Sequence, residues 1–219
     1  MSAHSATLLL ALAFAALDWV AVWRDLRRLE WVAKPLVIVA LLGTVAAAGD
    51  LSDLPTILVI AALLGSLAGD VLLMVPSGFV LGLVAFLVAQ LAYLARFLGE
   101  PLAPAGLVLG LAGAALLIGL VGRRIVGGAR RDGLAAPVVV YLAAICAMAI
   151  AAAGSGRWLA AVGAATFVAS DSLLGWDRFV RGTGRPGRAP GPERDRVWRI
   201  AVIATYHVAQ VLLVVGLVP

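Results

Sequence analysis

The sequence predicts an all-α membrane protein in which eight transmembrane helices form a single domain over residues 1–219. The chain is 63% hydrophobic and 13% charged, whereas soluble domains are about half apolar and about a quarter charged. Most of its apolar runs reach the ~17–25 residues that span the hydrocarbon core as a helix. A β-barrel would instead show alternating segments of ~10 residues. The runs cover residues 6–23, 32–48, 55–74, 79–97, 102–121, 135–153, 158–174 and 197–217.

The basic residues predict how the helices are oriented. The connections and helix ends on one side carry 15 of the 17 lysines and arginines, and the other side carries only Arg96 and Arg157. Cytoplasmic loops hold such an excess, so both termini should lie outside a cell (inner) membrane that the chain crosses several times. The net charge of +5 lies on membrane loops, so no nucleic-acid partner is expected.

The first half of the chain carries several polar residues on otherwise apolar helices. Residues 6–23 have no basic stretch before them, so we expect a retained helix, with Asp18 as an interfacial residue at its end. Lys34 opens the next run and either snorkels to the headgroups or partners an aspartate. Small residues precede Asp70 in run 55–74 and favour close helix contacts. Gln90 and Tyr93 share one face of run 79–97.

The second half repeats this pattern with one long connection. Run 102–121 has no ionisable residue and is predicted to be a packing helix. Tyr141 follows the start of run 135–153, and Ser170 flanks Asp171 near the end of run 158–174. Residues 175–196 are rich in glycine, proline and arginine, which indicates a flexible cytoplasmic loop against anionic headgroups. In run 197–217, Tyr206 and Gln210 share a face, while His207 points elsewhere as a packing or functional residue.

Asp70 and Asp171 lie within membrane-spanning runs, where a carboxylate is costly and usually functional. Both belong to the pattern A-[GS]-D-x-L-L and are 101 positions apart. Pro35 and Pro137 are 102 positions apart, which supports an internal duplication with repeats at 6–97 and 102–217. Four helices per repeat give both halves the same orientation, so the repeat is parallel and places both aspartates at one depth.

The predicted depths place the polar residues in one funnel that opens inward. Asp70, Asp171, Lys34 and Tyr141 should lie in its cytoplasmic half. The residues nearer the midplane are Gln90, Tyr93, Tyr206 and Gln210. Such a funnel, with lipid at its sides, would suit an amphiphilic ligand.

These motifs resemble the YhhN-like integral membrane family, which includes the lysoplasmalogenases. The most specific pieces are Gly69–Met74, read GDVLLM, and Phe167–Leu174, read FVASDSLL; weaker pieces are Lys34 with Pro35, Tyr93, Pro137 with Tyr141, and Tyr206 with Gln210. Family members typically have histidine where this chain has Gln90. The resemblance implies an eight-helix hydrolase that cleaves the vinyl ether bond of lysoplasmalogens, with the two motif aspartates as catalytic residues. A fatty aldehyde and glycerophosphoethanolamine or glycerophosphocholine would be the products.

Two close aspartates fit vinyl ether hydrolysis, which needs a proton donor, a nearby anion and a base for water. Two adjacent carboxyl groups cannot both ionise readily, so one would act as acid and the other as base. The polar residues named above would bind the lysophospholipid substrate, with Lys34 and the inner arginines at the phosphate. No cofactor and no metal are expected, and the sequence gives no indication of an oligomeric state.

Three alternatives remain open from the residues alone. Two aspartates could hold a divalent cation, although a chain with only His4 and His207 excludes a histidine-rich metal site. Paired intramembrane aspartates in a repeat would also suit a proton-coupled membrane transporter. Finally, the aspartates could only pair or cap helices in a structural bundle.

Overall fold

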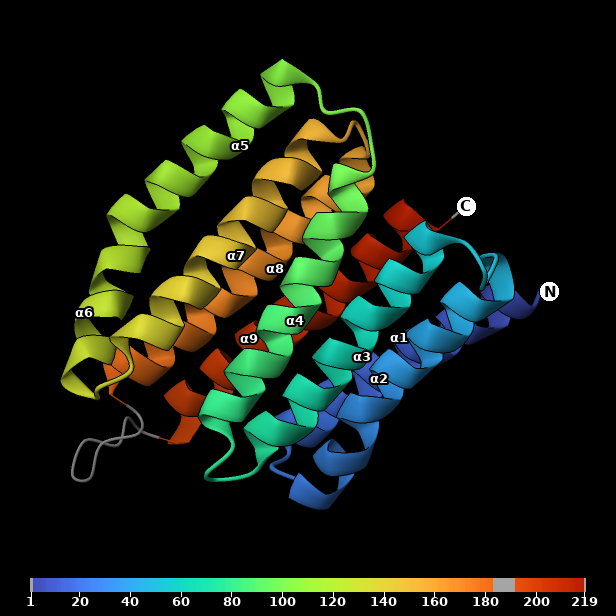
Figure 1. Ribbon diagram of the computed structural model, residues 1–219. Coiled ribbons are helices and arrows are strands. Elements are labelled where there is room, and N and C mark those ends of the chain that lie inside the picture. Colours follow the sequence, from blue (N-terminus) through green and yellow to red (C-terminus); the bar gives the residue numbers. More distant parts are fainter. Residues whose placement is uncertain (1, 183–191, 219) are drawn as a thin grey trace.

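The computed structural model describes residues 2–182 and 192–218, and this part of the chain holds eight helical spans long and apolar enough to cross a membrane (Figure 1). This confirms the predicted fold class. The helices are α1 (Ala3–Trp23), α2 (Arg27–Ala48), α3 (Leu54–Met74), α4 (Phe79–Leu98), α5 (Pro104–Leu117), α6 (Arg123–Arg131), α7 (Ala135–Gly154), α8 (Trp158–Trp176) and α9 (Pro192–Leu217), with π-helical turns η1 (Ile118–Gly122) and η2 (Asp177–Arg181).

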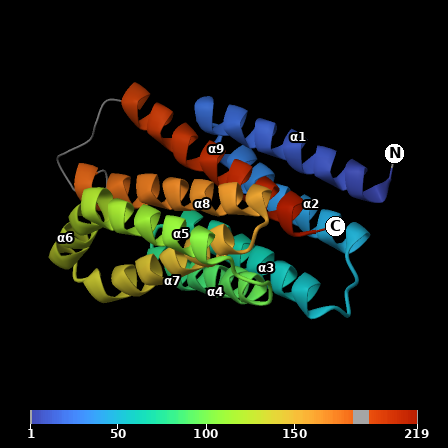
Figure 2. The ribbon, with the colours of Figure 1, turned by 90° about the horizontal axis from the view of Figure 1, so that it is seen from above.

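The helices pack in pairs into one bundle. α1 lies on α2, α3 on α4 and α8 on α9, while α4 contacts α7 and α1 contacts α9 (Figure 1 and Figure 2). Glycines allow these close approaches: a Cβ on Gly65 would lie 3.0 Å from the Ala85 carbonyl oxygen of α4, and one on Gly163 would lie 2.8 Å from the Leu213 nitrogen of α9. Gly65, one of the small residues before Asp70, therefore serves helix packing, as predicted.

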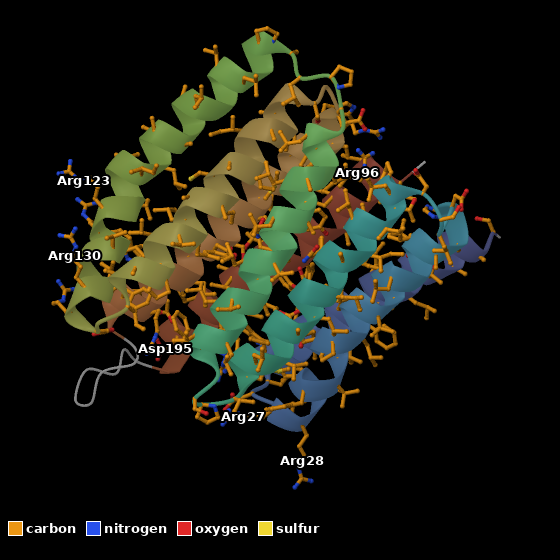
Figure 3. The ribbon with its side chains drawn as sticks, in the orientation of Figure 1. Arg27, Arg28, Arg96, Arg123, Arg130 and Asp195 are labelled. Carbon is orange, nitrogen blue, oxygen red and sulfur yellow. The ribbon has the colours of Figure 1, made fainter. Side chains whose placement is uncertain are left out.

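The two ends of the bundle differ in charge. Arg27, Arg28, Arg123 and Arg130 lie at one end, whereas Arg96 lies at the other (Figure 3). Both termini lie at the Arg96 end (Figure 1), as an even number of spans requires. We call the first the arginine-rich end, and its assignment to the cytoplasm stays a prediction.

A small ion-pair network ties the helices together at the other end. Glu100, in the α4–α5 connection, accepts hydrogen bonds from Arg96 at 2.8 Å and from Arg157 at 2.7 Å. These guanidinium groups, Arg96 above all, hold the pKa of Glu100 below its ordinary value. Arg157 also donates to the Gly216 carbonyl at 3.4 Å, so the network joins α4, α8 and α9.

The predicted inner loops were wrong in their extent. Residues 123–131, which connect the predicted runs 102–121 and 135–153, form α6 instead of a loop because Ile125 and Ala129 lie one turn apart and pack against buried Phe179. Most of residues 175–182 and 192–196 are also helical, although the sequence predicted a loop over 175–196. Arg181 bonds Asp177 at 2.7 Å and Asp195 at 3.2 Å, which joins η2 to α9. The flexible part of that prediction falls on 183–191, outside the described residues.

Candidate functional site

Asp70 lies inside the bundle with two donors on its carboxylate. The Lys34 ammonium is 3.0 Å from its Oδ1, and the Tyr206 hydroxyl donates to its Oδ2 at 2.7 Å. The aspartate is 1% exposed and the Lys34 side chain 13%. Three helices, α2, α3 and α9, therefore meet at this carboxyl group. Of the two expected positions for Lys34, the structure shows the one beside an aspartate.

Asp171 has a different environment. The Tyr141 hydroxyl on α7 donates to its Oδ2, and Gln90 on α4 donates to the Tyr141 oxygen at 3.4 Å. Within the described residues, Asp171 has no lysine or arginine at ion-pair distance. Each aspartate thus accepts a hydrogen bond from its own tyrosine, but only Asp70 also has a cation beside it.

A buried polar network extends from the Asp70 group toward the middle of the bundle. Gln210 donates to Ser66 at 2.8 Å and to the Tyr206 oxygen at 3.4 Å, and its own oxygen accepts from Tyr93 at 2.8 Å. These side chains are buried. Because the Gln210 amide bonds three partners, it fixes the position of Tyr206 and hence that of the Asp70 carboxylate.

Phe86 lies between the two aspartate groups. Its ring packs edge-on against Tyr206, the Asp70 partner, at 5.9 Å between centroids. It also lines a cavity with Tyr141 and Asp171. Gly69 makes this possible, since a Cβ at that position would lie 2.5 Å from the Phe86 ring. The glycine of the GD motif is therefore explained by the ring that packs over it.

Two adjacent cavities open near these groups. The apolar cavity, ≈ 70 Å³, is lined mostly by aliphatic and aromatic side chains together with Tyr141 and Asp171. The polar cavity, ≈ 470 Å³, lies at the arginine-rich end. Leu73 and Leu174 line both, so the cavities are neighbours. The charged residues that line the polar cavity are Asp25, Arg27, Glu30, Lys34, Asp177 and Arg199.

The predicted site residues fall into three groups. Lys34, Tyr206, Gln90 and Tyr141 contact the aspartates or their tyrosines, as just described. Tyr93 bonds Gln210 in the interior, and Gln210 also reaches Tyr206, the partner of Asp70, at 3.4 Å. The residues of the site that line neither of these two cavities are Asp70, Gln90, Tyr93, Tyr206 and Gln210. Ser170 lies apart, because its hydroxyl donates to the Val202 carbonyl of α9 at 2.9 Å.

Sequence reasoning missed several residues. Ser66 lies one turn before Asp70, a spacing that could have signalled its proximity. Phe86 gave no signal, because an apolar residue on an apolar helix carries no pattern of its own. Asp18 was expected at the interface, which is wrong, since its side chain is 0% exposed. His207 accepts a hydrogen bond from Trp19 at 3.1 Å.

The fold and the site define the class of protein as an α-helical, multi-pass membrane protein with two unlike carboxyl centres, Asp70 buried and Asp171 partly buried, beside an apolar and a polar cavity. The chain belongs to the YhhN family, whose model matches residues 29–217. The family match therefore includes every residue of both aspartate centres and leaves out α1.

Curated relatives bear the name lysoplasmalogenase. Lysoplasmalogenase TMEM86B of Homo sapiens is 32% identical over 155 residues, which is 69% of this chain and 59% of the relative. The Mus musculus protein of the same name is 30% identical over 203 residues, 89% of this chain and 79% of the relative. Lysoplasmalogenase of Mycobacterium tuberculosis is 37% identical over 137 residues, which is 56% of this chain and 50% of the relative. The match thus spans about three fifths of the human relative. No solved structure matches the chain.

Proposed function

We propose that this protein is a membrane hydrolase that cleaves the vinyl ether bond of lysoplasmalogens. The products would be a fatty aldehyde and glycerophosphoethanolamine or glycerophosphocholine. The name of the relatives, lysoplasmalogenase, supports the activity, and the observation that carries the chemistry is the difference between the two carboxyl centres. The site would work in a cell (inner) membrane, with the arginine-rich end in the cytoplasm.

Asp70 is suited to be the base. An ammonium at 3.0 Å and a hydroxyl donor at 2.7 Å both stabilise its ionised form. A carboxylate fixed in this way can support a developing cation and accept a proton from water. Lys34 and Tyr206 would be positioning residues for this group.

Asp171 is suited to be the acid. It lines an apolar cavity and has a tyrosine donor but no cation within the described part of the chain. Moving a lone carboxylate into such surroundings is costly, so the neutral carboxylic acid is favoured. The unlike partners of the two groups therefore support this assignment of the two roles, which the sequence left open.

The reaction closes with both groups restored. The Asp171 proton passes to the β-carbon of the vinyl ether, and an oxocarbenium-like cation forms. Water adds to the carbon next to oxygen while its proton passes to Asp70, which gives a hemiacetal. In the collapse, Asp171 takes the hemiacetal O–H proton as the C–O bond to glycerol breaks, and Asp70 returns its proton to the leaving glycerol oxygen.

The two cavities suit the two ends of a lysolipid. The hydrocarbon chain would lie in the apolar cavity beside Asp171, and the headgroup would occupy the polar cavity, which carries both signs of charge. Arg199 is engaged by Asp25 and Glu30 at 3.1 and 2.8 Å, and Lys34 is engaged by Asp70 at 3.0 Å. Arg27, which also lines the polar cavity, is therefore the better partner for a phosphate. The vinyl ether of a lipid that spans both cavities would lie near their shared wall of Leu73 and Leu174.

The test is aldehyde release by purified protein given vinyl ether, saturated ether and ester lysolipids. Only the vinyl ether lipid should be cleaved. Asp70→Asn and Asp171→Asn should each lose ~10²–10⁴-fold or more in rate, and the double variant should be little worse, because the pair acts as a unit. Asp53→Asn, an exposed aspartate at the other end, is the control, and a chelator should have no effect. Wild-type release by either well-folded site variant would contradict the mechanism, and proton-coupled uptake by proteoliposomes would then favour the transporter.

A further inference from the structure

A third carboxyl group, fully buried, lies beside the proposed site on the first helix. Asp18 on α1 and His207 on α9 are both fully buried, and 3.9 Å separates Asp18 Oδ2 from His207 Nε2. Neither carboxylate oxygen nor Nε2 has a hydrogen-bond partner in the described part of the chain. Buried polar atoms are nearly always bonded, so three such atoms at one place call for an explanation.

The histidine tautomer follows from its other nitrogen. The Trp19 indole N–H donates to His207 Nδ1 at 3.1 Å. Because Nδ1 accepts, a neutral ring carries its proton on Nε2, the atom nearest Asp18. A small approach of the two side chains would let Nε2–H donate to the carboxyl group.

This pair adjoins the Asp70 centre. His207 follows Tyr206, whose hydroxyl bonds Asp70, and the two rings are 5.5 Å apart. Val22 and Ile203, each one turn from a member of the pair, line the polar cavity. The pair therefore lies just beyond the wall of the cavity, and its Asp18 member is on α1, which the family match does not include.

The charges around Asp18 do not balance without a further proton. Those that act on it come from Lys34 and Glu30 of α2, Asp70 of α3 and Arg199 of α9. Glu30 and Arg199 pair at 2.8 Å and compensate each other. This leaves one ammonium against two carboxyl groups, so the buried cluster would carry a net negative charge if both ionised. In a buried site, protonating one carboxyl group costs less free energy than burying an uncompensated negative charge.

We propose that Asp18 and His207 form a second proton-binding site, in which the proton resides on the Asp18 carboxyl group and leaves Asp70 as the ionised partner of Lys34. Asp70 has two donors on its oxygens and Asp18 has none, so the proton belongs on Asp18. Asp18 is thus a positioning residue for the charge of Asp70. The effect of Asp18 on the pH profile of turnover rests on the proposed hydrolase function, whereas the protonation of Asp18 itself does not.

Infrared spectroscopy of the purified protein tests the protonation without any substrate. Wild-type protein labelled with ¹³C-aspartate should show carboxylic-acid C=O bands from Asp18 and Asp171 at neutral pH. Asp18→Asn should lose one of these bands, and Asp171→Asn should lose the other. Asp25→Asn, an exposed control, should keep both. An Asp18→Asn spectrum that keeps both bands would overturn the proposal. If that variant does not fold, the labelled wild type decides, because a single band, the one lost in Asp171→Asn, would overturn it equally.

The pH profile of aldehyde release tests the consequence. At high pH the wild-type Asp18 would lose its proton, which leaves two ionised carboxyl groups against the single Lys34 ammonium, and turnover should fall. Asparagine has no such proton to lose. Asp18→Asn should therefore keep its turnover near neutral pH and remain active to higher pH than the wild type. An unchanged profile in a well-folded variant would refute the link to Asp70. If the protein cleaves no vinyl ether at all, the proposed function fails while the infrared result still stands.

Discussion

Replacing Lys34 by methionine tests the assignment of Asp70 as the ionised base. The change removes the ammonium 3.0 Å from Asp70 but keeps much of the side chain's length. Breaking a buried ion pair from one side costs about 3–5 kcal/mol. Asp70 can limit this loss by binding a proton on folding, which for an ordinary aspartate near pKa 3.9 costs about 4 kcal/mol at pH 7. The stability deficit against wild type should therefore be about 4 kcal/mol at pH 7 and should shrink as the pH falls.

The same variant should lose most of its turnover, because a protonated Asp70 cannot accept a proton from water. We expect a decrease of ~10²–10⁴-fold at neutral pH, with partial recovery at higher pH as Asp70 ionises again. Denaturant unfolding in detergent and aldehyde release across pH measure the two effects. Arg28→Met is the matched control, since Arg28 is exposed near the start of the same helix (Figure 3). A folded Lys34→Met protein with the wild-type profile would refute the role given to Lys34.

Three further changes separate the parts of the proposed site. Val138 is buried and lines the apolar cavity with Asp171, so Val138→Lys should hold that carboxyl ionised and reduce turnover by ~10²-fold or more, whereas the uncharged Val138→Met should not. Arg27→Gln should raise KM for lysolipid and leave kcat nearly unchanged, which steady-state kinetics would show. Glu100→Gln should lower stability by about 0.5–1 kcal/mol at neutral pH. Because the pKa of Glu100 is lowered in the fold, this difference should be present above pH ~4.3 and vanish as the pH falls through the lowered pKa, and unfolding curves across pH would test it.

The helices were predictable because bilayer thickness fixes how long an apolar run must be. The same criterion did not predict that α6 and η2 are helical, since an apolar run ends where arginines begin. There, short apolar contacts such as Ile125 with Phe179 decide that the chain stays helical. Run length thus predicts the membrane span, but side-chain periodicity decides where the helix ends.

The aspartates themselves were predictable, and their partners only in part. A carboxyl group within an apolar run is visible in the sequence, because its cost must be compensated. Its compensation comes from other helices: Tyr206 bonds Asp70 from 136 positions away, and Tyr141 bonds Asp171 from 30. Asp18 was misjudged for the same reason, since its position near a helix end suggested solvent, while α9 covers it.

The proposed duplication would explain why there are two aspartates, and its imperfection would explain why they can differ. The 102-residue offset of the two prolines pairs Lys34 with Ala136, and Ala136 is exposed. The second half therefore supplies a tyrosine to its aspartate but no ammonium. A fully symmetric pair would give both carboxyl groups the same preference for a proton, and neither would be set apart as acid or base. A single unmatched lysine is enough to remove that equivalence, because it stabilises one charge by several kcal/mol and leaves its counterpart in an apolar cavity.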